Sequence, residues 1–306
     1  MTARRRRRAL AVWLLLAAAC GSDDDAAQPD GGPGASFSPP ECQVEFGHTL
    51  IFKTVTLLPQ GEGVDITGDD VPDNLLGRIA PLANPTIVQV IANGTGVFLL
   101  DFTGWEDAPA DDDDMEVTFY LGADSDIPPD PSDNTSGHGD FLVVDRQFDV
   151  DCNPLTRVPT SVAGRVARAT PAVWRFLIEG VGTLSFERIQ LEVEFTPDLT
   201  GFSGQFGTGW GMCSLAHTEG PLFAGATLLE RLVNDFEEPD PDLDFDGDGL
   251  EHVVGDGEGI ASCIDGDGTV IEGPDCPCDP RMGDAYSVSV AVEGAAATIS
   301  GIIYGQ

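Results

Sequence analysis

The segment TLSFERIQLEVEF (183–195) decides the fold class of this chain of 306 residues. Its second part alternates apolar with polar side chains: Ile189, Gln190, Leu191, Glu192, Val193, Glu194 and Phe195. Successive side chains of a strand point to opposite faces, so this alternation indicates a strand with one face in a core and the other in water. Strands of this kind are typical of antiparallel sheets, and the segment predicts a mainly β protein.

Other segments rich in Val, Ile, Thr and Phe surround it and also predict strands: 42–59, 96–102, 115–122, 140–150, 173–180, 208–216 and a hairpin-like pair at 285–305. Two segments predict short helices, 84–94, with Asn84 as N-cap and Pro85 at the first helical position, and 225–236. We therefore expect an antiparallel β-sandwich of one or two modules with a few short helices and long acidic loops.

The expected organisation follows the changes in composition along the chain. It comprises a signal peptide at 1–19, a lipidated N-terminus and flexible tether at 20–40, a first β-rich module at 41–153 and a second at 154–306. The second module contains an acidic, Cys-rich loop, 235–284, in which no periodic element is recognisable. So long a loop in a compact domain requires something to order it, and disulfides or bound cations are the two obvious agents.

The N-terminus MTARRRRRALAVWLLLAAAC (1–20) has the features of an export signal. Five arginines precede an apolar stretch that is far shorter than the roughly 20 residues that span a bilayer. The end of this stretch, Ala17 to Cys20, resembles the lipobox of bacterial lipoproteins; an ordinary secretory signal is the alternative. The resemblance implies that Cys20 is diacylated and anchors the protein in a membrane. Gly21 and the acidic residues after it then imply the outer membrane or the cell surface.

The charge of the chain limits its partners. There are 52 acidic and 15 basic residues, and five of the basic ones lie in the signal peptide, which leaves a formal charge of about −42 after cleavage. Such a chain repels nucleic acid and other anionic surfaces, and it concentrates divalent cations around itself.

Six cysteines follow Cys20, and an even number in an exported chain predicts three disulfides. Thiolate metal sites are the alternative, but CPC (276–278) lacks the two-residue gap of a zinc knuckle. We expect Cys42 to pair with Cys152. The other four would then pair among themselves in the second half: Cys213, Cys263, Cys276 and Cys278.

The stretch DLDFDGDG (242–249) places four aspartates two residues apart: Asp242, Asp244, Asp246 and Asp248. The pattern matches the opening of an EF-hand loop, but Val253 stands at the twelfth position, where a bidentate Glu is required. It more nearly resembles the D-x-D-x-D-G turns of thrombospondin type 3 repeats, which implies structural calcium completed by a neighbouring loop. That neighbour would supply Asp265, Asp267 and Glu272. A solvated acidic loop is the alternative.

The segment GVDITGDDVPDN (63–74) is a degraded version of the same pattern. Asp65, Asp69 and Asp73 have similar spacing, but Asp70 stands where glycine is usual. Calcium binding and an ordinary Asx-rich turn are equally consistent with it.

No catalytic residue can be assigned from the sequence, since it contains no zinc-protease, nucleophile-elbow or phosphate-loop motif. The leading hypothesis is a cell-envelope lipoprotein with calcium as structural cofactor and a structural or binding role toward a glycan or an envelope partner. A surface hydrolase with two facing carboxylates is the alternative. Glycan stacking would require exposed tryptophans at 105, 174 or 210, whereas buried core tryptophans are the simpler interpretation.

Overall fold

The structure is a computed structural model that describes ten stretches of the chain: residues 42–94, 96–105, 111–149, 151–178, 182–211, 241–244, 253–255, 261–264, 270–272 and 284–304. The predicted signal peptide, the tether and the 225–236 helix lie outside these residues.

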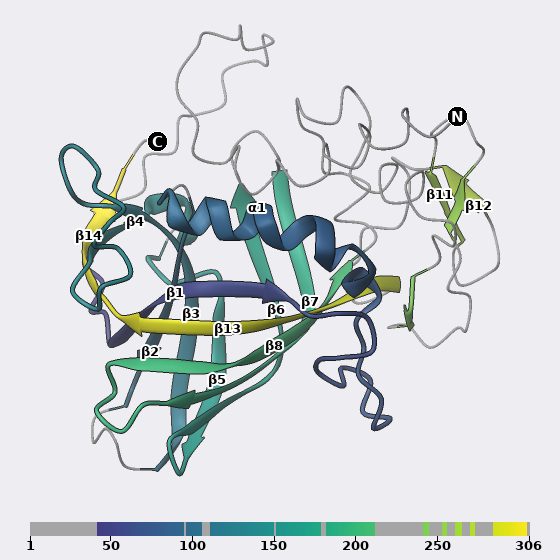
Figure 1. Cartoon of the computed structure of the whole chain (residues 1–306), viewed down its shortest axis with the longest axis horizontal. Coiled ribbons are helices and arrows are strands. Elements are labelled where there is room, and N and C mark those ends of the chain that lie inside the picture. The colour runs from purple at the N-terminus through teal and green to yellow at the C-terminus, as the bar shows by residue number, and fades with distance from the viewer. Residues whose placement is uncertain are drawn as a thin grey trace, which may run out of the picture.

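The described residues form fourteen strands, one α-helix and two short 3₁₀ helices (Figure 1). The strands are β1 (His48–Leu57), β2 (Val97–Thr103), β3 (Asp112–Asp124), β4 (Asp140–Val144), β5 (Arg157–Ala163), β6 (Val166–Ile178), β7 (Gly182–Phe195), β8 (Gly201–Gly211), β9 (Leu243–Asp244), β10 (Val253–Gly255), β11 (Ala261–Ile264), β12 (Val270–Glu272), β13 (Asp284–Ala296) and β14 (Thr298–Ile303). The helices are η3 (Leu75–Ile79), α1 (Ala80–Ala92) and η4 (Asp145–Gln147).

Eight strands close into an antiparallel barrel in the order β3-β2-β1-β13-β8-β7-β6-β5. The closing contact is between β3 and β5, where Val117 is paired with Val158. The long strand β3 permits this closure because its two parts have different neighbours on one edge: residues 112–118 pair with β5, and residues 122–124 pair with β4.

The mainly β prediction is confirmed, but the architecture is a closed barrel and not the expected sandwich. Alternation of side chains describes a strand with one buried face equally well in either architecture, and only the β3–β5 pairing decides between them. The barrel takes strands from both sides of the expected boundary at 153/154, so this boundary does not separate two sheets.

The expected hairpin at 285–305 is wrong. The strands β13 and β14 are consecutive, but β13 lies between β1 and β8, whereas β14 leaves the barrel and pairs in parallel with β4.

The barrel interior is filled by apolar side chains from all eight strands, and α1 lies across one end of the barrel (Figure 1). The helix contributes Ala83, Ile87 and Ile91 to this interior cluster. It begins at Ala80, four residues before the predicted N-cap, and Pro85 lies inside it. Asn84 has a different role from the predicted one, since its side chain accepts a hydrogen bond from Leu57 N (2.8 Å) and donates one to Leu57 O (3.0 Å).

A second core covers the outside of β1, β2 and β3. Ile51, Leu99 and Tyr120 alternate with residues of the interior and point outward, where β4, β14 and the N-terminal segment 42–47 cover them. The predicted disulfide between Cys42 and Cys152 is present and fastens this segment. The backbone N–H of Cys42 also donates to the Tyr304 hydroxyl (2.6 Å), so the first and the last described residues lie next to each other.

Candidate functional site

Two acidic stretches that are far apart in the sequence meet on the outer face of β13. On this strand Ser287 and Ser289 alternate with interior residues, and both are fully buried beneath the loop that follows β1. Asn74 organises that loop: its side-chain Nδ2 donates to three carbonyl oxygens of the segment 58–62, and its Oδ1 accepts from Ser289 N (3.1 Å). The loop therefore has a defined place against the barrel.

Asp242 joins the second acidic stretch to the same strand. Its carboxylate accepts hydrogen bonds from the backbone N–H of Ser287 (2.8 Å) and from the Ser287 hydroxyl, which in turn accepts from Leu75 N (2.6 Å). Burial raises the pKa of Asp242, and the neighbouring charge of Asp73 raises it further, whereas the hydrogen bonds from Ser287 act in the opposite direction. The first acidic stretch reaches the same strand two residues further on, where the Ser289 hydroxyl donates to the backbone oxygen of Asp73 (3.0 Å).

The 63–74 loop has the hydrogen bonds of an Asx-rich turn. The Asp65 carboxylate accepts from the backbone N–H groups of Gly68, Asp69 and Asp70 at 2.5–3.1 Å. Burial acts to raise the pKa of Asp65, but these donors hold it below its usual value. The Asp73 carboxylate accepts from the backbone N–H groups of residues 66 and 67. Calcium binding by Asp65, Asp69 and Asp73 stays a prediction.

The other predicted calcium ligands lie mostly outside the described residues: Asp246, Asp248, Asp265 and Asp267. Asp244 lies in β9, where it is paired with Asp284 of β13. Strands β10, β11 and β12 form a small antiparallel sheet, so the 235–284 segment does contain ordered elements that the sequence pattern does not reveal. Strands of three or four residues are too short for a recognisable alternation. Three of the other cysteines also lie outside the described residues: Cys213, Cys276 and Cys278. Of Cys263 only the backbone is described.

The structure contains a third acidic group, which the sequence pattern did not lead us to predict. Carboxylate oxygens of Asp124, Asp126 and Asp133 lie within 4.8 Å of one another. Loss of hydration raises the pKa of Asp126, and so do the charges of four neighbouring aspartates. Asp124 shapes the loop, because it accepts hydrogen bonds from the backbone N–H of Asp126 (2.9 Å) and of Asp130 (3.0 Å). The signal that could have found this group is the D-x-D spacing at 124–126.

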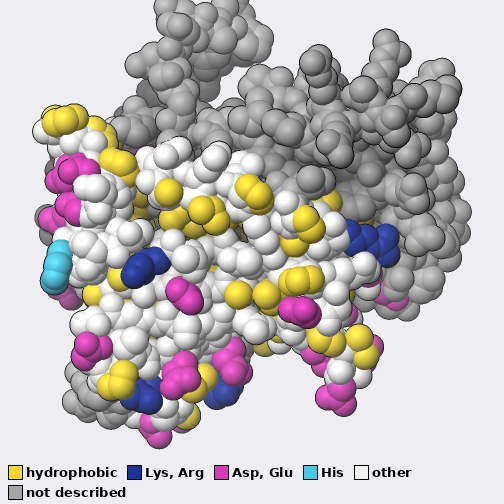
Figure 2. All heavy atoms as spheres, viewed as in Figure 1, with side chains coloured by type: hydrophobic (Ala, Val, Ile, Leu, Met, Phe, Trp, Pro, Cys, Tyr) yellow, Lys and Arg dark blue, Asp and Glu magenta, His cyan; other side chains and the backbone are white. Residues whose placement is uncertain are grey.

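These acidic groups are part of a surface with mixed charge. Figure 2 shows acidic side chains spread over the visible face of the molecule, including the loop that projects after β1, with Arg and Lys side chains between some of them. Carboxylate oxygens in such groups are the ligands that hard cations prefer.

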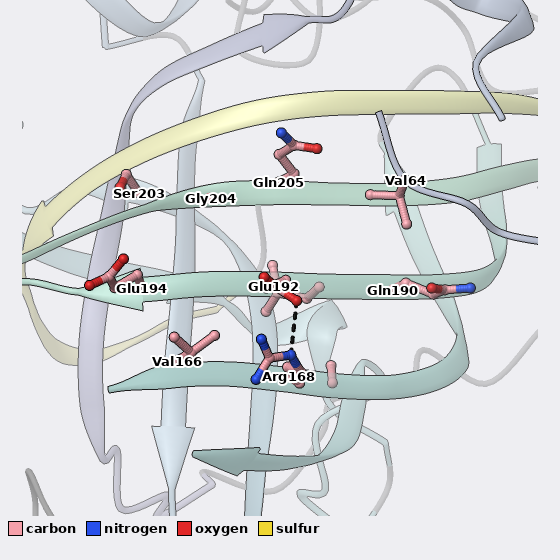
Figure 3. A pocket seen from close by; sticks show the side chains of 11 residues that line it. Val64, Val166, Arg168, Gln190, Glu192, Glu194, Ser203, Gly204 and Gln205 are labelled. Atoms are coloured by element: carbon pink, nitrogen blue, oxygen red, sulfur yellow. Dashed lines mark hydrogen bonds and ion pairs between the residues drawn. The ribbon is translucent and has the colours of Figure 1, made fainter. Parts of the chain in front are cut away.

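A groove of about 580 Å³ lies over the outer face of β6, β7 and β8 (Figure 3). Three of its side chains, Gln190, Glu192 and Glu194, are polar ones that the alternation in 183–195 assigns to water. Arg168 pairs with Glu192 (2.8 Å). The groove is lined by Val64, Val166, Arg168, Ala169, Gln190, Leu191, Glu192, Glu194, Ser203, Gly204 and Gln205. No periodic signal predicts it, because its wall at Val64 comes from the loop after β1.

The tryptophans do not form a stacking surface on the described part of the chain. Trp105 is 8% exposed and its ring packs on Phe195, with centroids 4.9 Å apart. The Trp210 ring is half-buried against Phe186, and the side chain of Trp174 lies outside the description. The interpretation as a core residue is therefore confirmed for Trp105.

The chain matches no protein-family model, no curated protein and no solved structure. Within the described residues, no helix is both long and apolar enough to span a membrane.

Proposed function

We propose that this chain is a lipid-anchored protein of the bacterial cell envelope, stabilised by calcium, with a structural or binding role. Cys20 would attach it to the outer membrane or the cell surface, and the barrel would be held away from the membrane by the tether at 21–40. The partner would be a glycan or another envelope protein. The sequence resemblance at 17–20 supports the anchor, and the acidic groups support the calcium.

The observation that carries the calcium proposal is the meeting of two acidic segments, more than 160 residues apart, on the outer face of β13, where Asp242 is hydrogen-bonded to Ser287 and Asp73 to Ser289. Carboxylates also gather in the 124–133 group, and two carboxylates about 4 Å apart repel each other by roughly 4 kcal/mol at an effective dielectric constant near 20. A fold that gathers acidic segments in this way is stabilised by a hard cation, and oxygen ligands with intervening glycines suit calcium.

The described groove supports binding more than hydrolysis. A glycosidase requires two carboxyl groups that face each other across the scissile bond. The two carboxylates of the groove, Glu192 and Glu194, lie two residues apart on β7, and each is in an ion pair with an arginine of the β5–β6 region. This arrangement places no second carboxylate on the opposite wall of the groove.

Calcium is expected to raise the melting temperature of the mature chain (residues 20–306, with Cys20→Ser so that no lipid is attached) by about 5–10 °C. This range follows from a stabilisation of about 2.7 kcal/mol at a calcium concentration of 100 times Kd, because a ligand that binds only the folded state stabilises it. Differential scanning calorimetry with calcium, with magnesium and with a chelator measures the shift.

Two variants show which acidic region holds the ion. Asp246→Asn removes a ligand of the predicted turn, and Asp126→Asn removes one from the 124–133 group; the variant of the occupied region loses the shift. Equal melting temperatures in millimolar calcium and in chelator would contradict the proposal of structural calcium. An equal shift with magnesium would show that the site is not specific for calcium.

Cys20→Ser is expected to move the full-length protein from the membrane fraction to the soluble fraction of bacterial cells and to abolish incorporation of a palmitate analogue. The reason is that acyl chains, at about 0.8 kcal/mol per buried CH₂, would be the attachment to the lipid. Ser36→Ala is the control, since it changes a residue of the tether and leaves both the anchor cysteine and the Cys42–Cys152 disulfide in place. Retention of the Cys20→Ser variant in washed membranes would contradict the lipid anchor.

A further inference from the structure

We propose that the groove over β6, β7 and β8 binds a neutral carbohydrate. The inference rests on the proposed binding role and assigns it a place and a ligand class. It is carried by the shape of the groove, by the polar groups that line it and by the balance of its charges.

The position of Val64 gives the groove a fixed wall. Val64 N donates to the Ser289 hydroxyl (3.1 Å), and Val64 O accepts from Asp73 N (2.9 Å), so the loop holds this residue against the barrel. The Val64 side chain lies over Gly207 of β8, where an added Cβ would come within 2.6 Å of Val64 Cβ. Glycine at this position therefore allows the wall to approach the sheet.

The groove presents hydrogen-bonding groups of both kinds. Gln190 donates from Nε2 to Ile66 O (3.2 Å), which orients its amide and leaves the side-chain oxygen as an acceptor. Ser203 and Gln205 are exposed, and their side chains make no hydrogen bond to any other described residue. The ion pair of Arg168 and Glu192 holds further donors and acceptors on the neighbouring strands β6 and β7 (Figure 3).

These groups favour a ligand with many hydroxyls. A hydroxyl donates one hydrogen bond and accepts two, so it matches amide, carboxylate and guanidinium groups together. Val64 and Val166 add an apolar surface at the edges, against which the C–H groups of a sugar ring can pack. A volume of about 580 Å³ is within the usual range of ligand sites, roughly 300–1,000 Å³.

The charges of the groove disfavour the other ligand classes. Glu192 and Glu194 are each paired with an arginine, so these groups have no net charge with which to attract an ion of either sign. The acidic character of the whole chain disfavours an anionic ligand further. A mainly apolar ligand would leave the polar lining without partners. A neutral polar ligand remains.

The test is NMR titration of the isotopically labelled mature chain (Cys20→Ser, 20–306) with neutral oligosaccharides, each up to about 10 mM, well above a weak dissociation constant of about 1 mM. Maltohexaose, cellohexaose, chitohexaose and mannohexaose are the neutral probes, and hexagalacturonate is the anionic one. Binding of a neutral probe should shift the amide signals of 166–169, 190–194 and 203–205. Gln205→Ala should weaken it about fivefold, the effect of one lost hydrogen bond.

Arg157→Ala is the matched control, because it breaks an exposed ion pair of the same kind, with Glu116 (3.2 Å), outside the groove. It should leave the affinity unchanged. The proposal is overturned if no neutral probe shifts the groove signals, if the shifts lie elsewhere, or if hexagalacturonate binds equally well. The calcium melt is independent of this titration: a failed titration with an intact calcium shift rejects the groove and leaves the proposed function, and the reverse rejects structural calcium alone.

Discussion

Replacing Cys42 and Cys152 together with serine is expected to lower the free energy of unfolding by about 4 kcal/mol. The disulfide closes a loop with a sequence separation of 110 residues, and the loss of chain entropy in the unfolded state grows with loop length. In the folded state the bond also holds the segment 42–47, whose Phe46 packs edge-on against Tyr120 with ring centroids 5.9 Å apart. Without the disulfide, the segment 42–47 is therefore held less firmly over the outer core.

Urea unfolding of the double variant and of the wild type measures this effect. The dependence of the unfolding free energy on urea should also become steeper, because the unfolded chain without the disulfide exposes more surface. Tyr304→Phe is the control: it removes only the hydrogen bond from Cys42 N and should cost about 1 kcal/mol. Equal unfolding midpoints for the double variant and the wild type would show that Cys42 and Cys152 do not stabilise the fold.

Asp101→Ala is expected to lower the free energy of unfolding by about 3 kcal/mol. Asp101 is fully buried in β2, and its Oδ1 accepts hydrogen bonds from Gly47 N (2.9 Å) and from the Thr49 hydroxyl (2.8 Å). Alanine leaves both donors without this acceptor in a buried site. Asp101→Asn is the matched control, because its side-chain oxygen still accepts from both donors and it does not titrate.

The difference in unfolding free energy between the wild type and the Asp101→Asn variant, measured as a function of pH, tests the charge of Asp101. Burial raises the pKa of Asp101 above its usual value, although the donors from Thr49 and Gly47 act to lower it. A carboxyl with a raised pKa binds more protons in the folded than in the unfolded state, so its contribution is present below about pH 4 and is lost as the pH rises through the folded pKa. The Asn variant should therefore gain stability relative to the wild type as the pH rises from about 4 through the folded pKa of Asp101. A stability difference that stays constant over this range would contradict a raised pKa.

The local elements were largely predictable, and their partners were not. The alternation at 189–195 correctly assigns Leu191 to the core and Glu192 to the surface, because a period of two is a property of the single strand. The β14 pairing with β4 had no such signal, since parallel neighbours can be far apart along the chain. The predicted hairpin failed for this reason.

The candidate site shows the same division. The aspartates at 242 and 73 are visible as patterned charge, but their two segments are brought together by hydrogen bonds to Ser287 and Ser289. These serines look like ordinary strand residues in the sequence, and only the structure shows that they are buried. The 124–133 group has only the D-x-D spacing of Asp124 and Asp126 as a signal in the sequence, because Asp133 joins these two through the turns of the loop.

By itself, the sequence determined the mainly β class and the positions of most strands around the interior, although β5 was not predicted. It determined these because the side-chain period is a local property of the chain. The expected pairing of Cys42 with Cys152 is confirmed, but the number of cysteines alone allows other pairings. Only the tertiary structure decided that the sheet closes through β3 and β5, that the segments of Asp73 and Asp242 meet on β13, and that Val64 makes a groove on the polar face of β7. Each of these depends on contacts between distant segments, and their free energy is gained only when the whole barrel is assembled.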